Sequence, residues 1–211
     1  MFTGIISELG TIAKPAVREK DGWRVQIEAP RTARGLAIGG SVAVDGVCLT
    51  AIEIHRNGFT VQVVAETARR SSFGARRFSR GGVFVNLERP MRANAEIGGH
   101  FVQGHVDAMG TVMSLKRAAR EVVLSVELPP ALTGLIVEKG SIAINGVSLT
   151  VASLESGGKP GFTVALIPHT MEHTNLGTLR EGDHVNLEAD ILGKYIRALL
   201  PGGGRRRRTG R

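Results

Sequence analysis

Short runs of alternating apolar and polar residues recur along this chain, and each run ends in residues typical of turns. Examples are SVAV at 41–44, VCLTAIEI at 47–54, FTVQVV at 59–64 and VFVNLE at 83–88. A period of two predicts strands with one buried face, and turns at intervals of about 8 to 12 residues are typical of an antiparallel barrel or sandwich. The pattern therefore predicts an all-β fold, and we favour a barrel.

The same pattern returns one hundred residues later along the chain. DGVCLT at 45–50 recurs as NGVSLT at 145–150, and VNLE at 85–88 recurs at 185–188. A period of this length is too long for a solenoid repeat and predicts two tandem copies of one fold. We place the first domain at residues 1–92 and the second at residues 98–188.

The segment after the second copy, DILGKYIRALL, changes to helical periodicity. Lys194 and Arg197 share one side of the predicted helix, and Pro201 with Gly202 end it. We expect a helix within 189–200 that packs against a barrel or against its equivalents in other subunits. Its other side consists of the apolar residues Ile191, Leu192, Tyr195, Ile196, Leu199 and Leu200.

Charge and composition narrow the possible functions. The net charge is +8, but the final ten residues, GGGRRRRTGR, carry five arginines and leave only +3 for the rest of the chain. Residues 201–211 are thus predicted to be a solvated, disordered basic tail. Nucleic-acid binding through two small barrels and this tail is an alternative, but few aromatic residues are present for stacking on bases.

Cysteine usage and hydropathy bear on where the protein works. A single cysteine cannot form an internal disulfide bond, so nothing indicates an oxidising compartment. The first residues lack the features of a signal peptide, and no run approaches the roughly 20 apolar residues that a membrane-spanning helix needs. We therefore expect a cytoplasmic protein with no membrane partner.

The repeated corner fixes the direction of several side chains. Asp45-Gly46 and Asn145-Gly146 predict type I′ turns, and a two-residue loop sets the register of the two flanking strands. Branched apolar residues then share one face of each hairpin and fill the barrel. The opposite, outward face carries Ser41, Ala43, Cys48 and Thr50 in the first copy and Ser141, Ala143, Ser148 and Thr150 in the second.

Three residues are candidates for chemistry. A lone cysteine is commonly a small buried hydrophobe, but an outward Cys48 could act as a nucleophile if its surroundings favour the thiolate. His100 and His105 in GGHFVQGHVD are either structural or suited to proton transfer near neutral pH. Their spacing sends them to opposite faces of a strand, so we expect no metal site here.

Six segments together resemble one known family. They are MFTGII at the start, the DGVCLT and NGVSLT corners, GGHFVQGHVD, LIPHT, and VNLEADILGKY near the end. This set resembles the riboflavin synthases of the trimeric, two-barrel, lumazine-binding type, and covers residues 1 to 200. The resemblance implies two six-stranded antiparallel Greek-key barrels and a C-terminal helix that gathers a homotrimer.

The resemblance also implies a reaction. Two molecules of 6,7-dimethyl-8-ribityllumazine undergo a dismutation in which a four-carbon unit passes from one to the other. The products are riboflavin and 5-amino-6-(D-ribitylamino)uracil, and neither a cofactor nor a metal takes part. A non-catalytic lumazine- or flavin-binding protein of the same fold is the alternative, and an association with a lumazine synthase capsid stays open.

Site residues follow from the resemblance by position. It implies catalytic roles for Cys48, His105, Ser41 and Asp190, and substrate binding by strand segments of both copies. The first site would use Leu49, Thr50, Gln62, Val63, Val64, Ala65, Glu66, Thr67, Gly104 and Val106. The second would use Gly4, Ile5, Ile6, Lys139, Ser148, Leu149, Thr150, Ala165, Leu166, Ile167, Pro168, His169 and Thr170.

Overall fold

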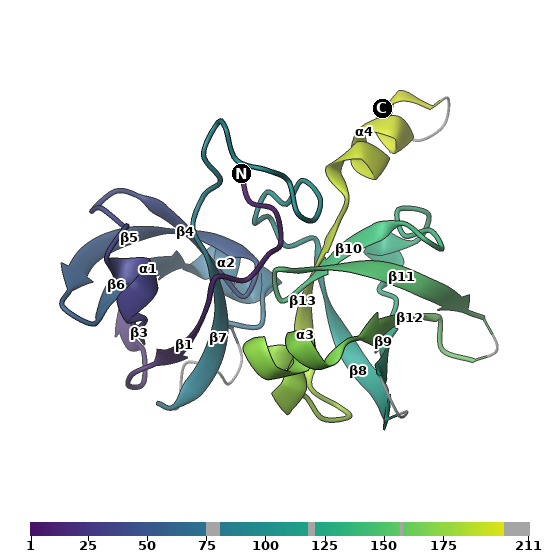
Figure 1. Ribbon diagram of the computed structural model, residues 1–211, viewed down its shortest axis with the longest axis horizontal. Coiled ribbons are helices and arrows are strands. Elements are labelled where there is room, and N and C mark those ends of the chain that lie inside the picture. Colours follow the sequence, from purple (N-terminus) through teal and green to yellow (C-terminus); the bar gives the residue numbers. More distant parts are fainter. Residues whose placement is uncertain (75–80, 118–120, 157, 201–211) are drawn as a thin grey trace, which may run out of the picture.

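The structure, a computed structural model, describes residues 1–74, 81–117, 121–156 and 158–200. Its strands form two barrels side by side, one from each sequence copy (Figure 1). The predicted all-β class with two six-stranded antiparallel barrels and a C-terminal helix is confirmed. The basic tail at 201–211 lies outside the described residues.

The first barrel is a sheet in the order β1-β7-β4-β5-β6-β3-β2, closed by pairing between β1 and β3. The short helices α1 (Pro30–Ala33) and α2 (Ala65–Arg70) lie between its strands. The strands are β1 (Glu8–Ile12), β2 (Val17–Glu19), β3 (Gly22–Glu28), β4 (Ser41–Val44), β5 (Val47–His55), β6 (Gly58–Val64) and β7 (Val83–Glu88).

The second barrel is closed in the order β10-β11-β12-β9-β8-β13. Helix α3 (Pro168–His173) and the 3-10 helices η2 (Pro130–Leu132) and η3 (Asn175–Thr178) connect its strands. The strands are β8 (Ala108–Arg117), β9 (Val122–Glu127), β10 (Ser141–Ile144), β11 (Val147–Glu155), β12 (Gly161–Leu166) and β13 (His184–Ala189).

The predicted hairpin register is confirmed in both copies. Ala43 pairs with Cys48 and Val44 with Val47, while Ala143 pairs with Ser148. Asp45 and Asn145 have φ angles of 47° and 46°, as a type I′ turn requires. Each barrel interior is a separate apolar core, and the valines and isoleucines of β4 and β10 that face inward are fully buried.

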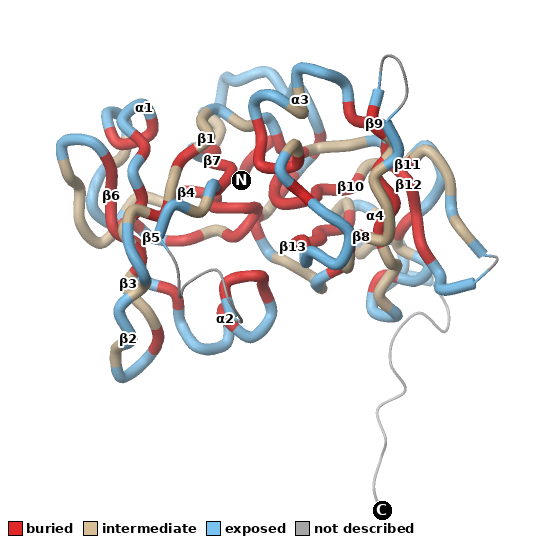
Figure 2. Tube along the Cα trace, turned by 90° about the horizontal axis from the view of Figure 1, so that it is seen from below, coloured by how far each residue is buried: buried red, intermediate tan, exposed pale blue. Residues whose placement is uncertain are grey.

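The outward faces of the two hairpins, which we call the ledges, consist of Ser41, Ala43, Cys48 and Thr50 in the first barrel and Ser141, Ala143, Ser148 and Thr150 in the second. Ala43 and Ala143, expected to face outward, are buried in a small cluster with Phe2 and Val102. Figure 2 shows buried stretches at both β4 and β10. Phe2 and Val102 form an isolated antiparallel bridge. The segments that precede β1 and β8 therefore cover part of each ledge. The alternation of apolar and polar residues in the strands does not predict this tertiary contact.

Two buried asparagine side chains also join the barrels. The Asn86 side chain donates to the carbonyl of Asn145 at 3.0 Å, and the Asn186 side chain donates to the carbonyl of Asp45 at 2.8 Å. These two bonds are equivalent under the repeat. Because buried polar groups are costly unless they are bonded, the pair fixes how the barrels sit against each other.

Helix α4 (Ile191–Leu199) extends away from the second barrel (Figure 1). Its polar side faces this barrel: Lys194 forms an ion pair with Asp107 at 2.7 Å, and Arg197 donates to the carbonyl of Thr133. Leu192, Tyr195, Ile196 and Leu199 are 58–83% exposed. In the described parts of the chain, no helix combines the length and the apolar character needed to cross a membrane.

Candidate active site

Cys48 lies outside the first barrel, half-buried at the wall of a cavity of about 210 Å³. Its neighbours Val47 and Leu49 point into the barrel core, so the pleat of β5 places the thiol on the opposite face. The residues that line this cavity are Val47, Cys48, Glu66, Thr67, Arg70, Ser71, Gly104, His105 and Val106.

The second copy supplies one wall of this cavity. Gly104 approaches so closely that a Cβ built on it would lie 2.6 Å from the Cβ of Cys48, and its φ of +81° favours glycine. The amide of Cys48 donates to the Gly104 carbonyl at 2.8 Å. The next residue is His105, so the structure brings together the predicted thiol and imidazole although 57 positions separate them in the sequence.

Helix α2 forms the wall opposite His105. Arg69 and Arg70 both pair with the Glu66 carboxylate, and their hydrogen bonds, Arg70 first, lower the pKa of Glu66. The strand predicted at 59–64 ends at Val64, and Ala65 begins the helix. The equivalent strand β12 ends at Leu166 and Pro168 begins α3, because proline suits the first turn of a helix.

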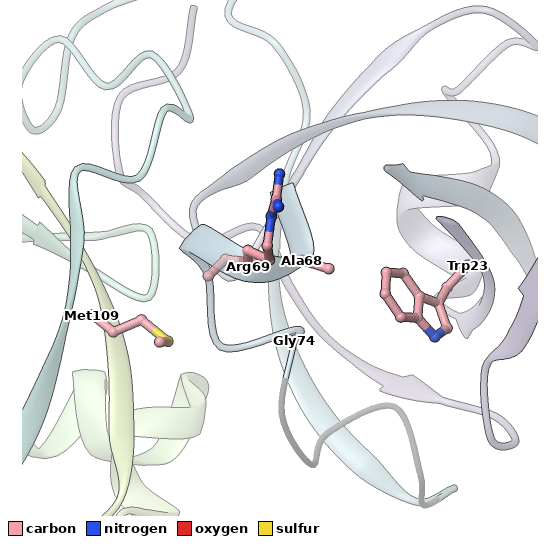
Figure 3. Close-up of a pocket in the computed structure, with 6 residues that line it drawn as sticks. Trp23, Ala68, Arg69, Gly74 and Met109 are labelled. Carbon is pink, nitrogen blue, oxygen red and sulfur yellow. The ribbon is translucent and has the colours of Figure 1, made fainter. Parts of the chain in front are cut away.

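A second cavity, of about 220 Å³, lies on the other side of α2. Figure 3 shows Arg69 and Ala68 of α2 between Met109 of β8 and Trp23 of β3. Ser71 lines this cavity as well as the one at Cys48. Helix α2 therefore contributes residues to the walls of both cavities.

The second barrel presents the equivalent surface around Ser148. The Ser148 amide donates to the Gly4 carbonyl at 2.8 Å, and a Cβ on Gly4 would lie 2.6 Å from that of Ser148. This reproduces the contact between Cys48 and Gly104. His100 adds a feature that the first barrel lacks, because its Nδ1 atom lies 2.7 Å from the Ser148 Oγ.

His100 is buried, and burial lowers its pKa, while the nearby charge of Asp190 opposes that shift. Asp190 itself caps α4 by accepting a hydrogen bond from the Leu192 amide at 3.0 Å. The predicted residue Asp190 therefore acts electrostatically on His100, which lies beside Ser148 of the second barrel, and it does not line the cavity at Cys48.

Next to α3 lies a larger cavity, of about 520 Å³, at which residues of both copies meet. Among the predicted residues, Ile6 and His169 reach it, and the rings of His169 and His173 stack at 4.1 Å. Lys139 does not line it; that lysine has a φ of 64°, and its Nζ contacts the Ala152 carbonyl at 3.4 Å. The lining residues are Ile6, Ser7, Glu8, Leu9, Arg31, His169, Glu172 and His173.

Several predicted site residues turn their side chains elsewhere. Leu49, Val63 and Leu166 lie in the barrel cores, so only their backbone could reach a ligand. Ser41 pairs with Thr50 at the far end of the hairpin and does not line the cavity at Cys48. Gln62, Val64, Ala65, Thr150, Ala165, Ile167 and Pro168 are exposed, as is Ile5, while Leu149 and Thr170 are half-buried.

Sequence reasoning named His100 as structural or suited to proton transfer, but it left out several lining residues, among them Arg70, Ser71 and His173. The repeat holds a signal for two of them. Counting with the shift of 103 residues that aligns FTV at 59–61 with FTV at 162–164, Arg70 corresponds to His173.

Comparison with known proteins agrees with this duplicated arrangement. The family model described as "Lumazine binding domain" matches residues 3–90 and again residues 103–190. The chain belongs to the lumazine-binding riboflavin synthase family. Each match covers one barrel together with the segment that reaches across to the other barrel's ledge.

Curated relatives support the same placement over nearly the whole length. Riboflavin synthase of Actinobacillus pleuropneumoniae is 42% identical over 95% of this chain and 90% of its own. The enzyme of Mycobacterium tuberculosis strain H37Rv is 41% identical over 97% of this chain and 100% of its own. The enzyme of Bacillus subtilis is 38% identical over 95% and 90%.

Solved structures show the fold with ligands bound. LumP complexed with riboflavin superposes with a TM-score of 0.78 at 25% identity, covering 90% of this chain and 99% of LumP. LumP complexed with 6,7-dimethyl-8-(1'-D-ribityl) lumazine gives a TM-score of 0.75 at the same identity and coverage. The relatives named as enzymes are thus more similar in sequence than LumP is.

Proposed function

We propose that this chain forms riboflavin from two molecules of 6,7-dimethyl-8-ribityllumazine, one bound at each barrel. The observation that carries the proposal is the half-buried Cys48 outside its barrel, in one cavity with His105 from the other copy. The identity of 38–42% to riboflavin synthases over nearly full length supports the enzyme over a non-catalytic binding protein.

The reaction requires removal of a proton from the 7-methyl group of one lumazine and attack at C7 of the other. We assign proton transfer to His105 and stabilisation of the C7 adduct to Cys48, while Ser41, at the far end of the hairpin, does not line the cavity at Cys48. Asp190 has a supporting role through its field at His100. Holding the two rings in the reactive orientation supplies more than any side chain, roughly 7 to 11 kcal/mol.

Ligand binding is assigned to the ledges and to the segments beside them. Backbone groups of the outward strand segments hydrogen-bond the ring edge, while hydroxyl and charged side chains hold the ribityl chain. We assign the latter task to Glu66 and Thr67 at the first site and to Ser148 and His169 at the second, since Glu66, Thr67 and His169 line cavities and Ser148 lies beside His100.

The proposed assembly is a homotrimer in which the first barrel of one subunit faces the second barrel of its neighbour. The exposed apolar side of α4 supports this, because side chains such as Leu199, 83% exposed, are stabilised when a partner covers them. Together with the cytoplasmic location expected from the sequence, the trimer is part of the proposal.

The test is to mix the purified protein with the lumazine and follow riboflavin by absorbance and fluorescence. We expect turnover without added cofactor, and a strong loss of turnover in Cys48→Ser and His105→Ala. Both variants should keep the oligomeric state of the parent. Lumazine binding without riboflavin formation would support the non-catalytic alternative, and full activity in both variants would remove the assigned roles.

A further inference from the structure

Two buried carboxylates occupy equivalent positions at the ends of the barrels. Glu88 ends β7 and is 7% exposed, and Glu188 lies near the end of β13 and is 3% exposed. Burial raises the pKa of both carboxyl groups, and hydrogen bonds from backbone amides oppose the shift. Burying a carboxylate is costly in free energy unless the group is hydrogen-bonded, so the partners of each carboxylate indicate its structural role.

Glu188 accepts hydrogen bonds from three successive amides. Its Oε1 lies 2.6 Å from the amide nitrogen of Gln103, and its Oε2 lies 2.9 Å from those of Gly104 and His105. Amides that converge in this way form an anion-binding concavity, here occupied by the protein's own side chain. The conformation of residues 103–105 is therefore set by Glu188.

Residues 103–105 include two residues of the second copy that line the cavity at Cys48 in the proposed first site, namely Gly104 and His105. Gly104 contacts the Cβ of Cys48 and accepts its amide hydrogen bond, and His105 enters the cavity beside the thiol. A chain of short bonds thus runs from Glu188 through the 103–105 backbone to Cys48 and His105. Glu188 does not line the cavity, so it would not contact a ligand there.

The other end of the segment is also tied to the second barrel. Asp107 accepts a hydrogen bond from the Ala189 amide at 2.9 Å and pairs with Lys194 of α4 at 2.7 Å. The Lys194 charge also acts on Glu188, because it lowers the pKa of that carboxyl. Residues 103–107 are thereby held at both ends by groups within 188–194.

Glu88 makes the matching contacts in the first barrel. Its Oε1 accepts from the amide and the hydroxyl of Thr3 at 2.7 and 2.8 Å, and its Oε2 accepts from the Gly4 amide at 2.9 Å. Gly4 in turn contacts Ser148 of the second barrel. In both barrels, a buried glutamate thus accepts hydrogen bonds from the segment that covers the other barrel's ledge.

We propose that Glu188 is the positioning residue of the first site, holding Gly104 and His105 against Cys48, and that Glu88 does the same for Gly4 at Ser148. The inference rests on the proposed function for its effect on catalysis. The positioning of Gly104 over Cys48 can be tested independently of the proposed function, because it can be measured without enzyme turnover.

Cys48 is the only cysteine, so its alkylation by iodoacetamide reports on the cover that Gly104 provides. In Glu188→Gln, an amide donor replaces one carboxylate oxygen opposite the backbone N–H groups. We expect the full-length variant to alkylate Cys48 several-fold faster and to lose roughly 10- to 100-fold in kcat. Glu88→Gln should leave the alkylation rate unchanged while lowering kcat, because its contacts lead to Ser148.

Glu155→Gln is the matched control, since its carboxylate bonds Ser125 at 2.6 Å and lines neither site. We expect it to match the parent in both measurements. An alkylation rate and kcat equal to the parent in folded Glu188→Gln would overturn the proposal. A parent that alkylates as expected but forms no riboflavin would instead refute the proposed function.

Asp107→Asn keeps the proposal testable if Glu188→Gln does not fold. It removes the charge that pairs with Lys194 but retains an acceptor for the Ala189 amide. Residues 103–107 are then held more weakly at the Asp107 end only. We therefore expect Cys48 to alkylate about twofold to threefold faster. Parent-like alkylation in this folded variant would contradict the proposed role of the segment.

Discussion

The Nδ1 atom of His100 lies 2.7 Å from the Oγ atom of Ser148, which joins the segment before β8 to the ledge of the second barrel. The Nε2 atom of this imidazole is buried and has no hydrogen-bond partner among the described residues. A buried lone pair without a partner is tolerated better than a buried N–H. The arrangement therefore favours Nδ1–H donating to Ser148, which leaves the serine hydroxyl hydrogen for a ligand.

The first prediction concerns this pair. His100→Leu removes the donor, and we expect lumazine affinity at one of the two sites to fall by about tenfold, the value of one hydrogen bond. His100→Asn places an amide N–H near the position of Nδ1 and should retain more of the affinity. Calorimetric or fluorescence titration resolves the two sites, and two unchanged affinities in His100→Leu would contradict the prediction.

The second prediction concerns pH. Burial lowers the pKa of His100 from its ordinary value of 6.5, so below that pH the unfolded chain binds a proton that the native chain does not. The contribution of His100 to the free energy of unfolding is therefore present above about pH 6.5 and is lost as the pH falls toward its native pKa.

Urea denaturation at about pH 7.5, 6.5 and 5.5 measures this loss. We expect the decline in stability over this range to be smaller in His100→Asn than in the parent. His184→Asn, at an exposed histidine, serves as the control and should decline like the parent. Equal declines in all three proteins would show that His100 does not couple protonation to folding.

The third prediction concerns the approach of Gly104 to Cys48. Gly39 and Gly104 have similar φ angles of +82° and +81°, but a Cβ on Gly39 meets no atom within 4 Å. Gly39→Ala should therefore cost only the backbone strain of about 1 to 2 kcal/mol. Gly104→Ala adds a clash and should lower the free energy of unfolding by about 1 to 3 kcal/mol more. Equal losses by chemical denaturation would contradict the close approach.

The fourth prediction concerns the network between the barrels. The Asn86 side chain bonds the carbonyl of Asn145, the Oδ1 of Asn175 and the amide of Asn175, all of them buried. Asn86→Ala should cost about 2 to 4 kcal/mol, because it leaves several buried groups unpaired. Asn57→Ala, at an exposed turn, should change the free energy of unfolding by less than about 0.5 kcal/mol. A small effect at Asn86 would show that the network is not what holds the barrels in place.

The fifth prediction concerns assembly through α4. Leu199→Glu places a charge in its exposed apolar side and should dissociate the proposed trimer, as measured by sedimentation velocity. Val17→Glu introduces the same charge at a 56% exposed residue of β2, and we expect it to sediment like the parent. An intact trimer in Leu199→Glu would exclude α4 as the contact.

Local rules account for what could be predicted. The Asp45-Gly46 turn sets the register of β4 and β5, and the pleat then decides that Cys48 leaves the barrel while Leu49 enters it. The same rules failed where burial depends on distant segments, as at Ala43. The hydrophobic periodicity of the sequence does not indicate that Phe2 and Val102 cover Ala43.

The amino-acid sequence was sufficient to predict the duplicated barrels, the register of the two corners and the helical period of α4, because turn geometry, pleat and amphipathic spacing act between near neighbours. The contacts of Gly104 with Cys48, of His100 with Ser148 and of Glu188 with residues 103–105 became known only from the folded arrangement. Residues 48 to 85 positions apart make these contacts. Packing of one barrel against the other creates them, and no local pattern encodes it.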